Sequence, residues 1–160
     1  MLAEQLQENE LAAALAAIYP AAITGGAMAH GELTLHIEPD DILAVLEFFK
    51  QQQQFERLST VTAVDRYPLE PRFEIVYHLQ SVARNLRVRL KASVTAEIAS
   101  ATAVYAAANW YEREVFDLFG VVFSGHPNPK RIMMPDDWEG HPLRRDFPTH
   151  GFKYSYGEQQ

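Results

Sequence analysis

The densest group of side chains that could do acid–base or ion-pair chemistry is Glu112-Arg113-Glu114, followed closely by Asp117. The surrounding residues are mostly apolar and favour a helix. Positions three and four apart on a helix are neighbours, so Trp110, Glu114 and Asp117 share one face. Arg113 stands four residues before Asp117 and can reach it along the helix edge.

Two interpretations of this acidic cluster are open. A catalytic pair of carboxyl groups needs two different environments, so that one of them keeps its proton. Here the adjacent Arg113 would hold both acids ionised, and no nucleophile or substrate pocket is indicated. We therefore favour an ion-pair network that fixes the helix against the following segment or a partner.

A second candidate for chemistry is a set of imidazole and carboxylate groups in the last third of the chain. Their spacing is wide and includes no His-x-x-x-His pair of the kind that binds zinc on a helix. A metal-dependent hydrolase built on them is the weaker alternative, and we favour roles in turns, since Gly-His-Pro occurs at 125–127 and 140–142. The residues concerned are His126, His141, His150, Asp136, Asp137 and Asp146.

Cofactor chemistry has little support in the sequence. The chain contains no cysteine, which excludes disulfides, cysteine-ligated zinc and ordinary iron–sulfur ligation. It also lacks GxGxxG, phosphate-loop and GxSxG motifs. We expect no catalytic or metal-binding residue and no cofactor on this chain.

Composition narrows the class of protein further. The chain has 160 residues, 48% of them hydrophobic and 22% charged, enough apolar material for one globular unit. Its net charge of −7 argues against nucleic acid as a partner. No run approaches the roughly 20 apolar residues that span a bilayer, and the acidic N-terminus lacks the basic start of a secretory signal. We expect a cytoplasmic location, with membrane attachment only through partners.

Hydrophobic periodicity predicts an α+β fold with helices packed on a mixed or antiparallel sheet. Helices are expected at 3–19, at 39–51 with Asp40 or Asp41 as its N-cap, and at 102–119 between a Thr102 cap and Gly120. A flexible break is expected at residues 25–26. Strands are expected at 33–37, 55–65, 73–79 and 86–92, the last two forming a hairpin.

One strand of this hairpin carries a basic face, made of Arg87, Arg89 and Lys91. It could be a docking stripe. We favour a solvated sheet face that discourages edge pairing.

The composition changes after Gly120, where prolines recur every few residues and no helix or central strand is expected. We therefore divide the chain into a globular domain at 1–120 and an extended segment at 121–160. This segment, hereafter the tail, is rich in large apolar residues that it cannot bury on itself. A long structureless segment of this kind indicates a partner surface on which it lies.

The stretch 110–148 resembles a known family, the thirty-kilodalton (C) subunit of bacterial respiratory complex I. Its sequence is WYEREVFDLFGVVFSGHPNPKRIMMPDDWEGHPLRRDFP. The family signature is matched at every position, by Glu112, Arg113, Glu114, Asp117, Leu118, Phe119, His126, Lys130, Ile132 and Met133.

The resemblance implies a non-catalytic scaffold in the peripheral arm of the proton-pumping NADH–quinone oxidoreductase, on the cytoplasmic side of the inner membrane. FMN, the iron–sulfur clusters and quinone would be held by partner subunits. The tail would lie over the (D) subunit that helps to form the quinone site, hereafter the quinone-site subunit, and the other neighbours would be iron–sulfur subunits. Related subunits also occur in photosynthetic NDH, deazaflavin-dependent dehydrogenases and membrane-bound hydrogenases.

By the same resemblance, two sets of residues receive roles. Glu112, Arg113, Glu114 and Asp117 would brace the helix where the tail departs. The interface with the partner would comprise His126, Lys130, Arg131, Asp137, Trp138, His141, Arg144, Arg145 and Asp146.

Overall fold

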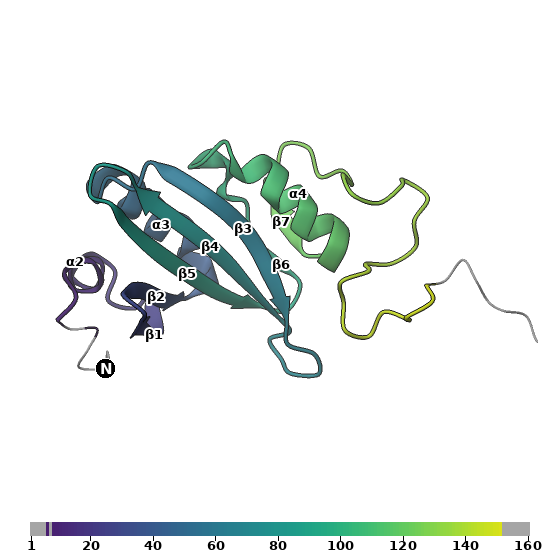
Figure 1. Ribbon diagram of the computed structural model, residues 1–160, viewed down its shortest axis with the longest axis horizontal. Coiled ribbons are helices and arrows are strands. Elements are labelled where there is room, and N and C mark those ends of the chain that lie inside the picture. Colours follow the sequence, from purple (N-terminus) through teal and green to yellow (C-terminus); the bar gives the residue numbers. More distant parts are fainter. Residues whose placement is uncertain (1–5, 7, 152–160) are drawn as a thin grey trace, which may run out of the picture.

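A computed structural model describes residue 6 and residues 8–151 (Figure 1). The helices are α2 (Glu10–Ile18), α3 (Ile42–Gln52) and α4 (Ala108–Phe119), with 3-10 turns η1 (Pro39–Asp41) and η2 (Ala101–Ala103). The strands are β1 (Ile23–Ala29), β2 (Glu32–Ile37), β3 (Arg57–Asp65), β4 (Phe73–Ser81), β5 (Leu86–Val94), β6 (Glu97–Ala99) and β7 (Val122–Ser124). The first part of the helix predicted from residue 3 lies outside the described residues.

Five strands form one mixed sheet in the order β1-β2-β5-β4-β3. The β2–β5 pair is parallel, and the other neighbours are antiparallel. The predicted hairpin is the β4–β5 pair, closed by the short turn after Ser81. The predicted α+β class, with helices on a mixed sheet, is confirmed.

The core lies on one face of this sheet because apolar residues alternate along its strands. Phe73, Ile75, Tyr77 and Leu79 of β4 belong to the same buried cluster as residues of α2, α3 and α4. Three aromatic rings stack edge to face within it, with Phe49 centred 5.4 Å from Phe48 and 5.3 Å from Phe55. The opposite face of the sheet, hereafter the outer face, carries mostly polar side chains, among them His78 and Gln80 of β4 and Arg87 and Arg89 of β5.

The expected break at residues 25–26 is wrong, because Gly25 and Gly26 lie inside β1. A bulge interrupts the pairing of β1 with β2 at this point. A Cβ atom at Gly26 would lie 2.5 Å from the carbonyl oxygen of Thr34. Glycine therefore permits a close approach of two strands here and does not mark a linker.

One predicted helix cap is confirmed in position only, and a second is wrong. Asp41 is the N-cap residue of α3, but it lies at the end of a 3-10 turn in helical conformation, and its side chain makes no capping hydrogen bond within the described part of the chain. The third helix begins at Ala108, not Thr102, after a separate 3-10 turn capped by Ser100. Its predicted end is confirmed, since Gly120 takes a left-handed conformation with φ of 75°.

The tail begins as part of the fold. Strand β7 pairs in parallel with β6, and from residue 125 to 151 the described chain contains only turns and extended backbone. The division at residue 120 remains a prediction from the sequence. Within the described residues, no helix is long and apolar enough to cross a membrane.

Candidate functional site

The end of α4 holds the tail through one buried carboxylate, that of Asp117. Its oxygens accept hydrogen bonds from Nη1 of Arg131 at 2.7 Å and from the amides of Ile132, Met133 and Met134 at 2.9, 2.7 and 2.9 Å. Burial acts to raise the pKa of Asp117, but these four donors outweigh it and hold the pKa below its usual range. Asp117 is therefore an ionised anchor for the tail.

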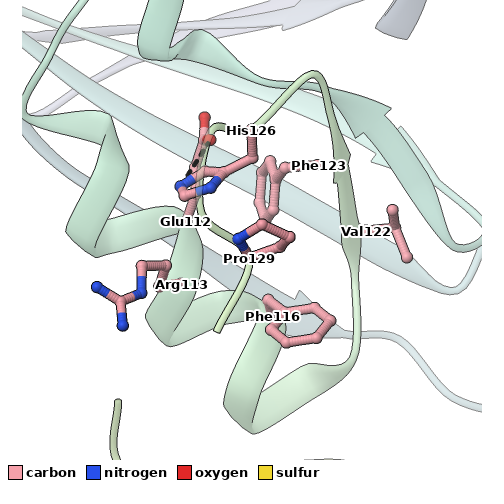
Figure 2. Close-up of a pocket in the computed structure, with 7 residues that line it drawn as sticks. All are labelled: Glu112, Arg113, Phe116, Val122, Phe123, His126 and Pro129. Atoms are coloured by element: carbon pink, nitrogen blue, oxygen red, sulfur yellow. Dashed lines mark ion pairs between the residues drawn. The ribbon is translucent and has the colours of Figure 1, made fainter. Parts of the chain in front are cut away.

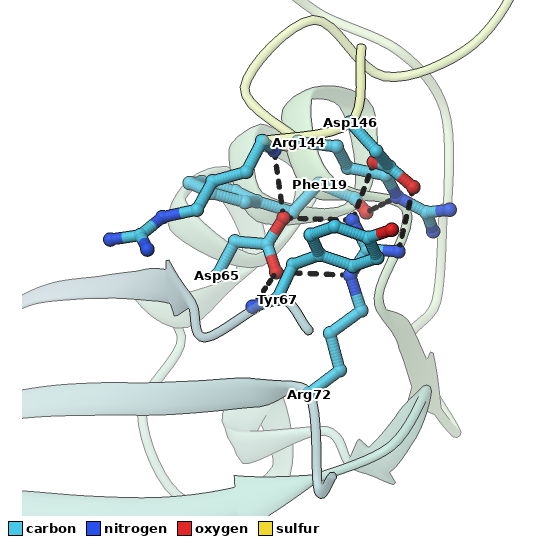
Figure 3. A network of polar contacts seen from close by, with 7 residues as sticks. Asp65, Tyr67, Arg72, Phe119, Arg144 and Asp146 are labelled. Atoms are coloured by element: carbon cyan, nitrogen blue, oxygen red, sulfur yellow. Dashed lines mark hydrogen bonds and ion pairs between the residues drawn. The ribbon is translucent and has the colours of Figure 1, made fainter. Parts of the chain in front are cut away.

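A second anchor lies at the end of β3, where Asp65 meets the returning tail (Figure 3). Arg72 donates to both Asp65 oxygens at 2.9 and 2.8 Å, and the amide of Arg145 donates at 2.9 Å. Arg72 also pairs with Asp146 at 2.6 Å. The hydrogen bonds that Asp65 accepts, above all those from the Arg72 side chain, lower the pKa of Asp65 to about 2, although burial opposes the shift.

Between the two anchors, the tail satisfies the free carbonyl groups at the C-terminal end of α4. Nδ1 of His141 lies 2.9 Å from the Asp117 carbonyl oxygen, and Nε of Arg144 donates to the Phe119 carbonyl at 2.6 Å. A Cβ atom at Gly120 would lie 2.5 Å from both the His141 ring and Nη2 of Arg144. The left-handed backbone there favours glycine, and a larger residue would also have to displace the ends of these two side chains.

Glu112 is the buried centre of the junction between α4, η2 and the tail. Its carboxyl group, 0% exposed, accepts hydrogen bonds from the Ser100 hydroxyl and the Ala101 amide, both at 2.6 Å. Burial raises the pKa of Glu112 to about 7, although both hydrogen bonds favour the charged form. The buried Tyr77 hydroxyl has no hydrogen-bond partner among the described residues, and the charge of Glu112 contributes to raising the pKa of Tyr77 beyond the effect of burial.

His126 lies against Glu112, with its Nε2 3.9 Å from a carboxyl oxygen (Figure 2). Nε2 contacts the Asn109 carbonyl at 3.0 Å, and Nδ1 accepts from the Asn128 amide at 3.0 Å. The amide contact places the ring proton on Nε2 and supports the predicted role of His126 in a turn. A small apolar pocket of about 30 Å³ opens beside the pair, bounded by Phe116, Phe123 and Pro129 among others.

The other two members of the predicted brace differ in position. Arg113 does not pair with Asp117, whose oxygens are taken by the tail. Its Nε donates to the Lys130 carbonyl at 3.0 Å, and its guanidinium lies 4.7 Å from the centre of the Trp110 ring. Glu114 is exposed.

The residues predicted to form the partner interface therefore make many contacts within the chain itself. His126, Arg131, His141 and Arg144 bind α4, while the Arg145 amide and the Asp146 carboxylate bind the end of β3 and its loop. Trp138 is half-buried, its indole nitrogen has no hydrogen-bond partner in the described part of the chain, and Asp137 is exposed. Asp65 and Arg72 were not predicted as site residues, because their partners lie 80 and 74 positions away.

The candidate metal ligands are not brought together. His126 and His141 bond backbone groups, and Asp146 pairs with Arg72. Across the described ranges, no group of three or more His, Asp or Glu side chains could hold a metal ion.

The sequence that forms this mixed sheet, helix α4 and the tail bound to α4 matches a family of respiratory proteins. The family model for the respiratory-chain NADH dehydrogenase 30 kDa subunit matches residues 35–153, and the chain belongs to this family. Its relatives include the NADH-quinone oxidoreductase C subunit of Xanthobacter autotrophicus, 41% identical over 95% of this chain and 75% of that protein. The same subunit of Cereibacter sphaeroides is 42% identical over 95% of this chain and 78% of that protein.

A solved structure also shares the fold. A chain of the membrane-bound sulfane sulfur reductase, an archaeal respiratory membrane complex, superposes with a TM-score of 0.70 at 28% identity. The match covers 91% of this chain and 83% of that one. The resemblance inferred from residues 110–148 is thus confirmed at the level of the family.

Proposed function

We propose that the chain is a non-catalytic structural subunit of the peripheral arm of a bacterial proton-pumping NADH–quinone oxidoreductase. It would support electron transfer from NADH to quinone by bracing the quinone-site subunit. FMN, iron–sulfur clusters and quinone would lie on partner subunits, and the chain would reach the cytoplasmic side of the inner membrane only through the complex. Membership of the 30 kDa subunit family supports this proposal.

One observation carries the role of the tail. Met133 and Leu143 expose 58% and 52% of their surface, yet the backbone of each is tied to α4. The Met133 amide binds Asp117 at 2.7 Å, and the Leu143 amide binds the Leu118 carbonyl at 3.1 Å. Fixed backbones carrying exposed apolar side chains are a preorganised docking surface, because binding then costs little ordering entropy.

A second candidate is the equivalent subunit of a related membrane complex. The structural likeness to a chain of the archaeal sulfane sulfur reductase complex favours it. The higher identity to NADH-quinone oxidoreductase subunits, over nearly the whole chain, favours the first.

The proposal is tested by placing charge on the docking surface. Replacing both Met133 and Leu143 by Asp should reduce the amount of assembled complex in membranes about tenfold, since buried apolar anchors dominate interface energies. Ile18→Asp, at an exposed apolar position on α2 far from the tail, is the matched control and should assemble normally. Normal assembly of the double variant would overturn the role of the tail.

A further inference from the structure

The outer face of the sheet collects cationic side chains in rows that the strand register fixes. Arg57 of β3, Gln80 of β4 and Arg87 of β5 are cross-strand neighbours. In the next row, His78 pairs in register with Arg89. Cross-strand neighbours on one face lie about 5 Å apart, so these groups form one continuous surface.

The charges on this surface are only partly neutralised. Arg89 pairs with Glu32 at 3.0 Å and Lys91 with Glu74 at 2.8 Å. Among the described residues, Arg57 and Arg87 enter none of the ion pairs. The whole chain carries 21 acidic and 14 basic residues, so this cationic surface is opposite in sign to the protein as a whole.

The surface is also hollowed. A depression of about 390 Å³ is lined by Glu32, Thr60, His78, Gln80, Arg87 and Arg89, among others. It lies over the start of β3 and the hairpin end of β4 and β5. The tail anchor at Asp65 lies at the opposite end of β3 (Figure 1).

The mixture of charges selects among anionic occupants. Glu32 in the hollow would repel a compact polyanion or a flat anionic lipid surface. A polypeptide segment presents carboxylates to Arg57 and Arg87 and, from its backbone, amide donors to Glu32. His78, whose pKa is lowered by burial and then by Arg89, can serve that segment as a neutral hydrogen-bonding group.

We infer that this hollow docks an acidic segment of another subunit of the same respiratory complex, as a second interface separate from the tail. The inference rests on the proposed function for the existence of that complex. It favours the docking stripe over the solvated face considered from the sequence, because the register adds Arg57 from β3 and the fold makes the face concave.

A photo-crosslinking residue in place of Gln80, in the complete complex purified from membranes, tests the inference. Gln80 lines the hollow but carries no charge, so the arginines remain. Crosslinking should join it to a peptide of another subunit with two or more Asp or Glu residues. A crosslink to phospholipid, to a peptide without acidic residues, or to nothing would overturn the inference.

Charge reversal supplies the second readout. In a salt wash, a chain carrying both Arg57→Glu and Arg87→Glu should dissociate from the purified complex at least about fivefold faster than the wild-type chain. Charges at the rim of an interface govern how its stability depends on salt. The matched variant Arg57→Lys and Arg87→Lys keeps both charges and should be retained like wild type. Both sites are exposed, so the urea-unfolding midpoint of the isolated chain should not change. Equal retention of the Glu variant would overturn the inference, and the Met133 and Leu143 substitutions report separately on the proposed function.

Discussion

The carboxylate of Asp117 lies 2.7 Å from Nη1 of Arg131, 14 positions further along the chain. This pair turns the tail back over the end of α4 immediately after the tail has left it. The tail is then held a second time by Asp65 and Arg72 at the end of β3. A segment without regular secondary structure thus acquires a fixed course, which a docking surface needs.

Removing the Asp117 carboxylate should release the tail. In Asp117→Ala, the partly exposed Arg131 and three backbone amides lose their shared acceptor, and loss of a hydrogen-bonded charged group of this kind costs about 1–3 kcal/mol. The free energy of unfolding in urea should fall by about that amount, and the amides of Ile132, Met133 and Met134 should exchange with deuterium much faster. Glu114→Gln, an exposed change on the same helix, should stay within about 0.5 kcal/mol of wild type. If the three amides exchanged as slowly in Asp117→Ala as in wild type, Asp117 would not be an anchor of the tail.

The Asp65 anchor predicts a specific weakness to acid. Its pKa is lowered from 3.8 to about 2, so its contribution is present above pH 3.8 and is lost as the pH falls through about 2. The difference corresponds to about 2 kcal/mol. Unfolding free energies measured from pH 6 to pH 2 should drop by this amount more in wild type than in Asp65→Asn. Parallel curves for the two proteins would contradict the assignment.

Glu112 predicts the opposite dependence at higher pH. Its pKa is raised from 4.5 to about 7, so its contribution is greatest below pH 4.5 and is lost as the pH rises through 7. The loss amounts to about 3 kcal/mol when complete. Glu112→Gln keeps an acceptor for the Ala101 amide but cannot ionise. The difference in unfolding free energy between wild type and this variant should change between pH 5 and pH 8, and a constant difference would rule the effect out.

Arg113→Ala should impair assembly of the respiratory complex without altering quinone reduction by the complexes that do assemble. The substitution removes the contact with the Lys130 carbonyl at 3.0 Å and the stacking on Trp110, so the start of the tail loses support. Quantifying assembled complex by native electrophoresis, and turnover per complex, separates the two effects. Normal assembly with lost turnover would argue for a catalytic role, and Arg113→Lys shows whether positive charge alone is sufficient.

Much of the fold follows from local patterns in the sequence. Alternation at Phe73–Leu79 and Leu86–Ala92 identified a hairpin because a half-buried strand requires that period. Strand β1 was missed because Gly25 and Gly26 favour turns, and only the approach of Thr34 explains them. The separate turn at Ala101–Ala103 was missed because the hydrogen bonds from Ser100 and Ala101 to Glu112 are tertiary.

The candidate site was predicted in part. The signature residues of α4 and of the tail were found, because they lie close together in sequence. Their pairing was not, since Arg113 is nearer to Asp117 in sequence than Arg131 is. Asp65 and Arg72 were not predicted, because their hydrogen bonds to the tail depend on how the end of β3 packs near α4.

The most direct test of the structural role is purification of the complex from source membranes through a tag on this chain. The proposed function predicts recovery together with the quinone-site and iron–sulfur subunits, and NADH–quinone activity in the same fraction. Recovery of the chain as a soluble monomer without redox partners would contradict it.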